Sequence, residues 1–309
     1  MKRILITAIG GDIGQSIAQC LRDSCDDLFL FGSDIHDKHV GKLYVNEFRV
    51  VPPATTSDYI NCISDIVASN NIDVIVPVNE TELRVLVNTS GDFHLIHCNK
   101  QIVNSGLDKL KMVELLKSLN IEMPWTVDAD NEVPINYPCI IKPRFSSGSR
   151  SIFIINSKEE ANLFSATNQG CVFQELLEPF EKEVTCALYR TRDGRIASLQ
   201  FERLLVGGLT GWAKVILDDE VDKILHVIAN KLSLQGSMNV QLRITEKGPM
   251  IFEINPRFSS TVYMRHKLGF TDVVWSLKEF YNKPIKLSSA KLGATIARKH
   301  EVVILAAGR

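Results

Sequence analysis

The sequence predicts an α/β domain at the N-terminus followed by an α+β domain. In residues 1–98, short apolar runs alternate with helical patterns, whereas from residue 99 onward most of the regular runs are strand-like. Alternation of strands and helices is typical of a doubly wound parallel sheet, and consecutive strands are typical of antiparallel sheets. We therefore expect one domain at residues 1–98 and a second at residues 99–309.

The first domain begins with an apolar run at residues 3–9, directly followed by Gly10-Gly11-Asp12-Ile13-Gly14. A helical pattern and a strand at 28–32, ending near Asp34, complete a strand–turn–helix–strand unit. A helix at 57–69, a strand at 73–77 and a helix that begins near Glu80 continue the alternation.

The glycine turn at Gly10–Gly14 lies where a dinucleotide fingerprint would lie, with Asp34 about 20 residues further on. The first glycine of that fingerprint would be at position 9, which is Ile9. We therefore favour a turn that packs a helix against the sheet, and keep a nicotinamide-dependent dehydrogenase as a minority alternative.

The second domain is expected to begin with a helix at 104–120. Strands are predicted at 138–142, 151–155, 171–174, 183–189 and 196–201, and a helix at 219–232. Two further strands, at 238–244 and 249–254, flank the turn signal Glu246-Lys247-Gly248 and predict a hairpin.

Composition excludes several classes of function. The 309 residues carry 35 basic and 36 acidic side chains, so the net charge of −1 gives no reason to expect nucleic acid or a membrane surface as partner. No apolar run approaches the roughly 20 residues of a membrane span. The seven cysteines include no Cys-x-x-Cys pair, and we expect reduced thiols in a cytoplasmic protein.

The segment around Lys142 predicts a phosphate-binding element. Lys142 ends an apolar strand and is followed by Pro143, Arg144 and a run of small residues that includes Ser147 and Gly148. Small side chains let the backbone approach phosphate oxygens, and the basic residues supply positive charge. The alternative is a surface turn with an isolated lysine.

Two glutamates in the following strands are candidates for nucleotide recognition. Glu175, with Leu176 and Leu177, lies in an extended segment that can offer backbone hydrogen bonds to a purine edge, and Glu183 could accept the ribose hydroxyls. Two solvated glutamates near strand ends are the simpler alternative.

The most specific pattern lies in the predicted hairpin. Glu253 and Asn255 are two residues apart on one strand and share a face, which Gln241 reaches from the paired strand. A carboxylate and two amide oxygens suit a hard cation such as Mg²⁺. Arg257 follows on the same face and can neutralise charge on a phosphoryl group. A purely structural amphipathic hairpin would place apolar residues here.

In this order, these motifs resemble the ATP-grasp superfamily, with the carbamoyl-phosphate-synthase-like and amino-acid ligase branches as the nearest. The resemblance implies a pre-ATP-grasp (Rossmann-like) domain at 1–98 and an ATP-grasp domain at 99–309. The latter divides into a smaller nucleotide-binding part (99–180) and a larger part with the metal and catalytic residues (181–309). It assigns ATP binding to the residues Lys109, Lys142, Ser147, Gly148, Glu175, Leu176, Leu177 and Glu183.

The resemblance also implies a reaction. Lys142 and Arg257 would be catalytic, and Gln241, Glu253 and Asn255 would hold Mg²⁺, with Mn²⁺ as an alternative ion. Gln241 departs from the Asp of many ligase branches. A substrate carboxylate would become an acyl phosphate and react with an amine. Alternatives are carbamoyl-phosphate-synthase-like phosphorylation of a small carboxylate and a non-catalytic ATP-binding protein.

Candidates for substrate binding are Arg203, which can pair with a carboxylate, and Ser259 and Ser260, which follow Arg257 directly. The alternatives are a surface arginine and a helix cap. Small-molecule partners are expected, and a homodimer would fit the family.

Overall fold

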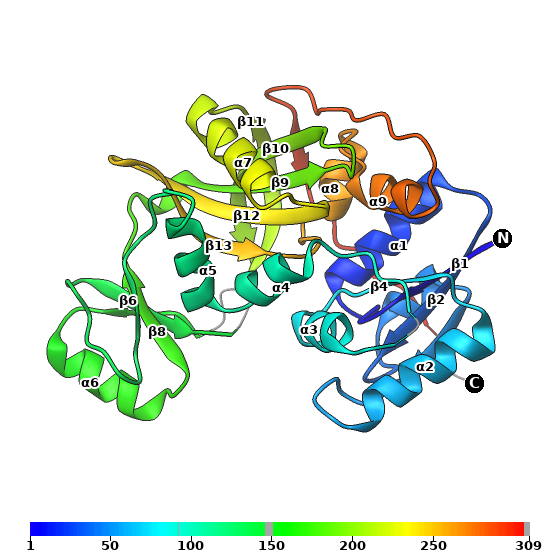
Figure 1. The fold of residues 1–309 in the computed structure, drawn as a ribbon, viewed down its shortest axis with the longest axis horizontal. Helices are drawn as coiled ribbons and strands as arrows, with labels where there is room; N and C mark the ends of the chain where they lie inside the picture. The colour runs from blue at the N-terminus through cyan, green and yellow to red at the C-terminus, as the bar shows by residue number, and fades with distance from the viewer. Residues whose placement is uncertain (92, 146–150, 306–309) are drawn as a thin grey trace.

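The computed structural model describes residues 1–91, 93–145 and 151–305, and the chain forms three sheets (Figure 1). A parallel sheet lies at the N-terminus, and two antiparallel sheets follow. The predicted fold class, an α/β domain followed by an α+β domain, is therefore confirmed. None of the helices formed by the described residues has the length and hydrophobicity of a membrane span.

The N-terminal sheet has the strand order β3-β2-β1-β4. Its elements are β1 (Lys2–Ile6), α1 (Asp12–Ser24), β2 (Leu28–Asp34), η1 (Val40–Tyr44), β3 (Glu47–Val50), α2 (Asp58–Asn70), β4 (Val74–Val76) and α3 (Glu80–Asn88). Alternate residues of β1 point to opposite faces, so Ile4 packs with α1 and Leu5 packs with α2. Both faces of the sheet are covered, as parallel sheets require.

The turn after β1 is built for close packing. A Cβ at Gly14 would lie 2.6 Å from the carbonyl oxygen of Ala8, so only glycine lets α1 approach the strand this closely. The Asp34 carboxylate accepts the backbone N–H groups of Gly10 and Ile35, each at 2.8 Å. Both carboxylate oxygens thus accept hydrogen bonds from the backbone. This is expected for a turn that packs a helix against the sheet, rather than for a carboxylate that binds ribose hydroxyls.

A small antiparallel sheet, with the order β5-β8-β6-β7, forms the lobe at lower left in Figure 1. Its elements are β5 (Thr126–Asp128), β6 (Cys139–Pro143), β7 (Phe153–Ile155), α6 (Lys158–Thr167) and β8 (Cys171–Glu175). Residues Ile141, Ala161 and Phe173 are buried together, so α6 and the sheet share one small core.

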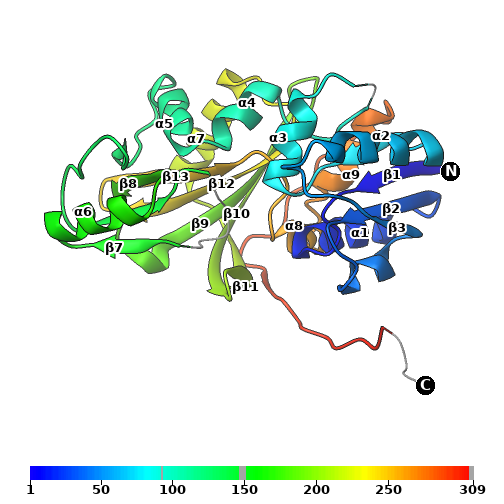
Figure 2. The ribbon, with the colours of Figure 1, turned by 90° about the horizontal axis from the view of Figure 1, so that it is seen from below.

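The large sheet has the order β13-β12-β9-β10-β11-β14. Its elements are η2 (Phe180–Lys182), β9 (Glu183–Arg190), β10 (Ile196–Val206), β11 (Leu209–Ile216), α7 (Asp219–Lys231), β12 (Gly236–Thr245), β13 (Gly248–Asn255), α8 (Val262–Lys267), α9 (Asp272–Phe280) and β14 (Thr295–Ala297). Figure 2 shows α4 (Lys100–Gly106), α5 (Lys109–Lys117) and α7 on one side of this sheet, where they share its core. The other face packs against α8 and α9. The domain boundaries at residues 98 and 180 remain predictions.

One local prediction was wrong. The single helix expected at 104–120 is two helices, α4 and α5, because Asp108 is extended and caps α5 by accepting the N–H of Leu110 at 3.1 Å. The connection between β10 and β11 is a tight turn. Gly207 and Gly208 both have positive φ there, which a two-residue hairpin turn of this kind requires.

Candidate active site

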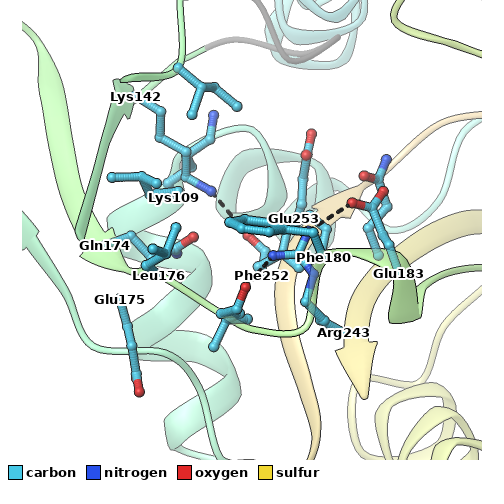
Figure 3. Close-up of a pocket in the computed structure, with 14 residues that line it drawn as sticks. Lys109, Lys142, Gln174, Glu175, Leu176, Phe180, Glu183, Arg243, Phe252 and Glu253 are labelled. Atoms are coloured by element: carbon cyan, nitrogen blue, oxygen red, sulfur yellow. Dashed lines mark hydrogen bonds and ion pairs between the residues drawn. The ribbon is translucent and has the colours of Figure 1, made fainter. Parts of the chain in front are cut away.

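Two neighbouring cavities lie beside β12 and β13 and share Gln241 and Glu253 in their walls. The first, of about 140 Å³, opens between the small and large sheets and is shown in Figure 3. The second, of about 500 Å³, lies between the large sheet and the carboxyl ends of β1 and β4. We name them the first cavity and the second cavity. Any reaction that joins their contents would take place at Gln241 and Glu253.

Two buried lysines enter the first cavity on the side opposite Glu183 and Arg243 (Figure 3). Lys142 ends β6 and Lys109 begins α5, and the Asp108–Arg144 pair connects these two elements. The Arg144 guanidinium donates to both Asp108 carboxylate oxygens, at 2.7 and 2.8 Å. This bidentate pair fixes the end of the strand against the start of the helix, so that both lysines reach the same space.

The burial of Lys142 disfavours its charged form. Burial lowers the pKa of Lys142 to about 7, a shift that Glu253 opposes and that the charges of Lys109 and Arg243 reinforce. The ammonium group donates to the carbonyl oxygen of Phe252 at 3.4 Å. Burial also lowers the pKa of Lys109. An anionic ligand in this cavity would stabilise the ammonium form of both lysines.

The predicted adenine segment forms another wall of the first cavity. Glu175 is the last residue of β8, and Leu176 and Leu177 follow it into the cavity wall. In the described part of the chain, the backbone N–H of Leu177 has no hydrogen-bond partner. The Glu175 carboxylate faces elsewhere, towards the N–H of Trp125 at 3.3 Å and Lys247 at 3.4 Å. The backbone of this segment, rather than the Glu175 side chain, is available to a planar ligand.

Glu183 is held between two arginines. Arg203 donates to one carboxylate oxygen from two nitrogens, at 2.5 and 3.1 Å, and Arg243 donates to the other at 3.1 Å. Arg203 was expected to receive a substrate carboxylate with its bidentate fork. In this structure the Arg203 guanidinium binds Glu183 instead, because β9 and β10 are neighbouring strands and bring the two side chains together.

The three predicted metal ligands meet where the two cavities join. Gln241 of β12 lies opposite Glu253 of β13, as the predicted hairpin requires, and Asn255 lies two residues further on. With the Asn255 amide oriented to satisfy its neighbours, its nitrogen donates to Glu253 at 3.3 Å and its oxygen accepts from Gln241 at 3.1 Å. The Gln241 oxygen accepts from Arg203 at 3.0 Å. A carboxylate and two amide groups are ligands that a hard divalent cation takes once both amide oxygens turn towards it.

Arg257 reaches the second cavity and is paired there with a residue of the N-terminal domain. Its guanidinium donates to Glu80 at 2.7 Å and to the carbonyl oxygen of Phe258 at 2.9 Å. Both side chains of the Arg257–Glu80 pair are mostly buried. The same Glu80 oxygen lies 3.2 Å from the Asn255 nitrogen in the orientation just described. Glu80 therefore links the N-terminal domain to the predicted metal site.

The remaining walls of the second cavity come from distant segments. The β10–β11 turn contributes Gly207 and Gly208, and the start of α1 contributes Asp12, which forms an ion pair with Arg298. Ser260 lines the cavity, and its carbonyl oxygen accepts from Arg298 at 2.7 Å. Ser259 also lines it, but its hydroxyl accepts from the buried Arg265 at 2.9 Å and so serves a structural network.

Three functional candidates were not found from the sequence, namely Asp12, Glu80 and Arg243. Asp12 and Glu80 follow β1 and β4, whose carboxyl ends meet at one edge of a parallel sheet, the usual place for ligands in such folds. That strand order was the missing signal. Arg243 lies two residues beyond Gln241 on the same strand face, so the sequence alone could have predicted that it lies beside the site. Ser147 and Gly148, both predicted to bind phosphate, lie outside the described residues.

Comparison with known families covers both parts of the chain. Residues 106–261 match a family described as an ATP-grasp domain, and residues 4–100 match a family described as a PylC-like N-terminal domain. The carbamoyl phosphate synthase large chain of Thermotoga neapolitana is 24% identical over 225 residues, which are 66% of this chain and 19% of that protein. The chain spans between 17% and 55% of the length of the curated relatives compared.

Solved structures show the same fold. N5-carboxyaminoimidazole synthetase from Staphylococcus aureus, complexed with ADP, superposes with a TM-score of 0.75 at 18% identity, covering 94% of this chain and 80% of that one. An L-amino acid ligase from Bacillus licheniformis gives a TM-score of 0.69 at 14% identity, over 91% and 74% of the two chains. The family match spans half of the chain and contains the Lys109, Lys142 and Glu253 positions. The resemblance inferred from the motifs is confirmed, and the chain belongs to the ATP-grasp family.

Proposed function

We propose that this chain is an ATP-dependent ligase that converts a carboxylate into an acyl phosphate and transfers the acyl group to an amine. The observation that carries the proposal is the junction of two cavities at Gln241 and Glu253. One cavity has the features of a nucleotide site, and the other presents Arg257 and the N-terminal domain. A phosphoryl group that crosses this junction would pass the predicted metal ligands.

The first cavity suits Mg-ATP. Lys109 and Lys142 would hold phosphate oxygens, and the backbone at Leu177 would bind the adenine edge. Glu183 would approach the ribose only by sharing its oxygens with Arg203 and Arg243, since both arginines already bind it. The synthetase from Staphylococcus aureus that shares this fold was solved in complex with ADP.

Gln241, Glu253 and Asn255 would hold the magnesium ion of Mg-ATP through their oxygens. The ion would supply positive charge that neutralises the charge developing on the phosphoryl group during transfer. Asn255 must turn its amide oxygen towards the ion, which breaks its hydrogen bonds to Glu80 and Glu253. Among the described residues, Glu80 is then held by Arg257 alone.

In the second cavity a carboxylate oxygen attacks the γ-phosphorus and ADP leaves. The amine then attacks the carbonyl carbon, and phosphate leaves with one of the original carboxylate oxygens. Arg257 would stabilise the transferring phosphoryl group and the tetrahedral intermediate. For this it must release Glu80, so an anionic substrate would exchange with the carboxylate of Glu80.

The test is a two-stage assay with the whole chain. ADP release with Mg²⁺ is first screened against paired pools of carboxylates and amines. The active carboxylate is then supplied with ¹⁸O in its carboxyl group, and the released phosphate is analysed by mass spectrometry. We expect ADP release to require both partners, and the phosphate to gain one ¹⁸O.

Other outcomes would contradict the proposal. Phosphate without ¹⁸O would exclude an acyl phosphate. Release with bicarbonate alone would indicate the carbamoyl-phosphate-synthase-like alternative, and tight ATP binding without turnover would indicate a non-catalytic protein. Tight binding of NAD(H) would support the alternative of a nicotinamide-dependent dehydrogenase.

A further inference from the structure

A cluster of one carboxylate and two histidines lies at the carboxyl end of β2, outside both cavities. Asp34 ends the strand, and His36 and His39 follow in the segment that leads to η1. One ligand atom from each residue lies within 4.8 Å of the other two. The centres of the two imidazole rings are 5.4 Å apart. None of these residues has a place in the proposed reaction.

His39 is the unusual member of the cluster. Both of its ring nitrogens are buried, and neither has a hydrogen-bond partner in the described part of the chain. Buried polar atoms without partners are rare in folded proteins and destabilise them. The ring packs edge-on against Phe48, with centroids 5.2 Å apart, so its orientation is fixed. A nitrogen that is buried, fixed and unsatisfied indicates a missing partner.

The surrounding backbone leaves room for this ring. A Cβ at Gly10 would lie 2.5 Å from the His39 ring and 2.9 Å from an Asp34 carboxylate oxygen. The absence of a side chain at Gly10 therefore lets the histidine and the carboxylate lie side by side. Gly10 also donates its N–H to Asp34, which holds the carboxylate in place.

The other two members are suited to binding a cation. Asp34 is buried, forms no ion pair with any described residue, and keeps a lone pair on each oxygen after accepting its two backbone N–H groups. His36 is exposed, and its contact with the N–H of Lys38 is long, at 3.3 Å. The His36 ring can therefore turn towards a cation at small cost.

We propose that Asp34, His36 and His39 bind a divalent cation of the zinc class, with water completing its coordination. Two imidazoles and a carboxylate are ligands that Zn²⁺ takes readily, whereas Mg²⁺ prefers oxygen ligands alone. The site is therefore chemically distinct from the oxygen-only set at Glu253. Zn²⁺ here would satisfy one His39 nitrogen and join the segment after β2 to the carboxylate that holds Gly10.

The cation would have a structural role close to the second cavity. The turn that begins at Gly10 leads into Asp12, which lines that cavity and pairs with Arg298. Fixing Gly10 through Asp34 would fix the start of α1. The inference does not depend on the proposed ligase activity.

The test is equilibrium dialysis of the untagged, chelator-treated chain against Zn²⁺ in an excess of Mg²⁺. We expect one Zn²⁺ per chain, and at least a tenfold weaker affinity, about the loss expected for a metal-site residue, in His36→Ala. His36 is exposed, so this variant should fold. The matched control is His226→Ala, because exposed His226 lies 3.7 Å from Asp222 and, among the described residues, belongs to no group of three possible metal ligands.

Cobalt distinguishes the ligands. Co²⁺ in place of Zn²⁺ should give visible absorption bands without a sulfur-to-cobalt charge-transfer band, and His36→Ala should change these bands. Failure of the wild-type chain to retain Zn²⁺ would overturn the proposal, as would equal affinity in His36→Ala. A thiolate band would overturn it too, because it would place the cation on cysteines such as Cys25 or Cys62.

Discussion

The two cavities that meet at Glu253 differ in how they are built. The first presents two buried lysines from neighbouring elements, and burial holds the pKa of Lys142 near 7. The charged groups of the second are already paired across domain boundaries, Arg257 with Glu80 and Arg298 with Asp12. The first cavity thus holds a lysine whose charge burial disfavours, whereas the second is bordered by ion pairs between the N-terminal and C-terminal parts of the chain.

This difference assigns different tasks to the two sides. A phosphate entering the first cavity would favour the ammonium form of Lys142, which burial disfavours. An anionic substrate in the second cavity must displace a carboxylate from an arginine. We therefore expect variants on the first side to change nucleotide affinity and variants on the second side to change the use of the acceptor substrate.

The largest effect is expected at the shared wall. Glu253→Gln removes the only carboxylate among the predicted metal ligands, so ADP release should fall by about 10²- to 10³-fold, as for loss of one electrostatic stabiliser of a transition state. The measurement is the initial rate of ADP release with saturating substrates. Glu246→Gln, in the exposed turn of the same hairpin, is the control. Near-wild-type rates in Glu253→Gln would remove this residue from the site.

The next effect separates the two sides. Glu80→Gln weakens the hold on Arg257 and should change kcat/KM for the acceptor substrates by about 10-fold or more, the range for a hydrogen bond between charged groups. The affinity for Mg-ADP should change less than kcat/KM does, since Glu80 does not line the first cavity. Glu47→Gln, exposed on β3, is the control. A change confined to nucleotide affinity would contradict the division of tasks between the first and second cavities.

The pH dependence of nucleotide binding sharpens the account of the first side. In the free protein Lys142 loses its proton above a pH of about 7, whereas bound phosphate favours the ammonium form and raises its pKa. Binding above pH 7 should therefore take up a proton, and affinity should fall by up to about tenfold per pH unit. Calorimetry at pH 8 in buffers of different ionisation enthalpy measures the uptake. Lys142→Met should abolish this proton uptake. Uptake that persists in the variant would show that another group takes up the proton.

The smallest effect concerns the support of the lysines. Asp108→Ala removes the cap of α5 and the partner of Arg144, and should lower the free energy of unfolding by about 1–2 kcal/mol. Urea denaturation measures this change. Glu122→Ala is the control, because Glu122 is an exposed carboxylate shortly after α5 and its loss should cost less than about 0.5 kcal/mol. Equal losses would show that the cap is unimportant.

The features that the sequence predicted correctly are those that depend on residues close together in the chain. The parallel sheet followed from alternating strands and helices, and the Gln241–Glu253 pairing followed from a hairpin with a clear turn. The break at Asp108 was missed because apolar residues continue at helical spacing on both sides of it. The Glu80–Arg257 pair joins residues 177 apart in the chain, and no local pattern reports such a contact.

The central claim is that the first cavity binds Mg-nucleotide through its buried lysines. The most direct measurement is a calorimetric titration of Mg-ADP into the wild-type chain, Lys142→Met and the control Lys223→Met, which alters an exposed lysine on α7. The account predicts one ADP per chain for wild type and Lys223→Met, and at least about tenfold weaker binding for Lys142→Met, because a charge-assisted contact is lost. Equal affinity in all three proteins, or no binding by the wild type, would contradict it.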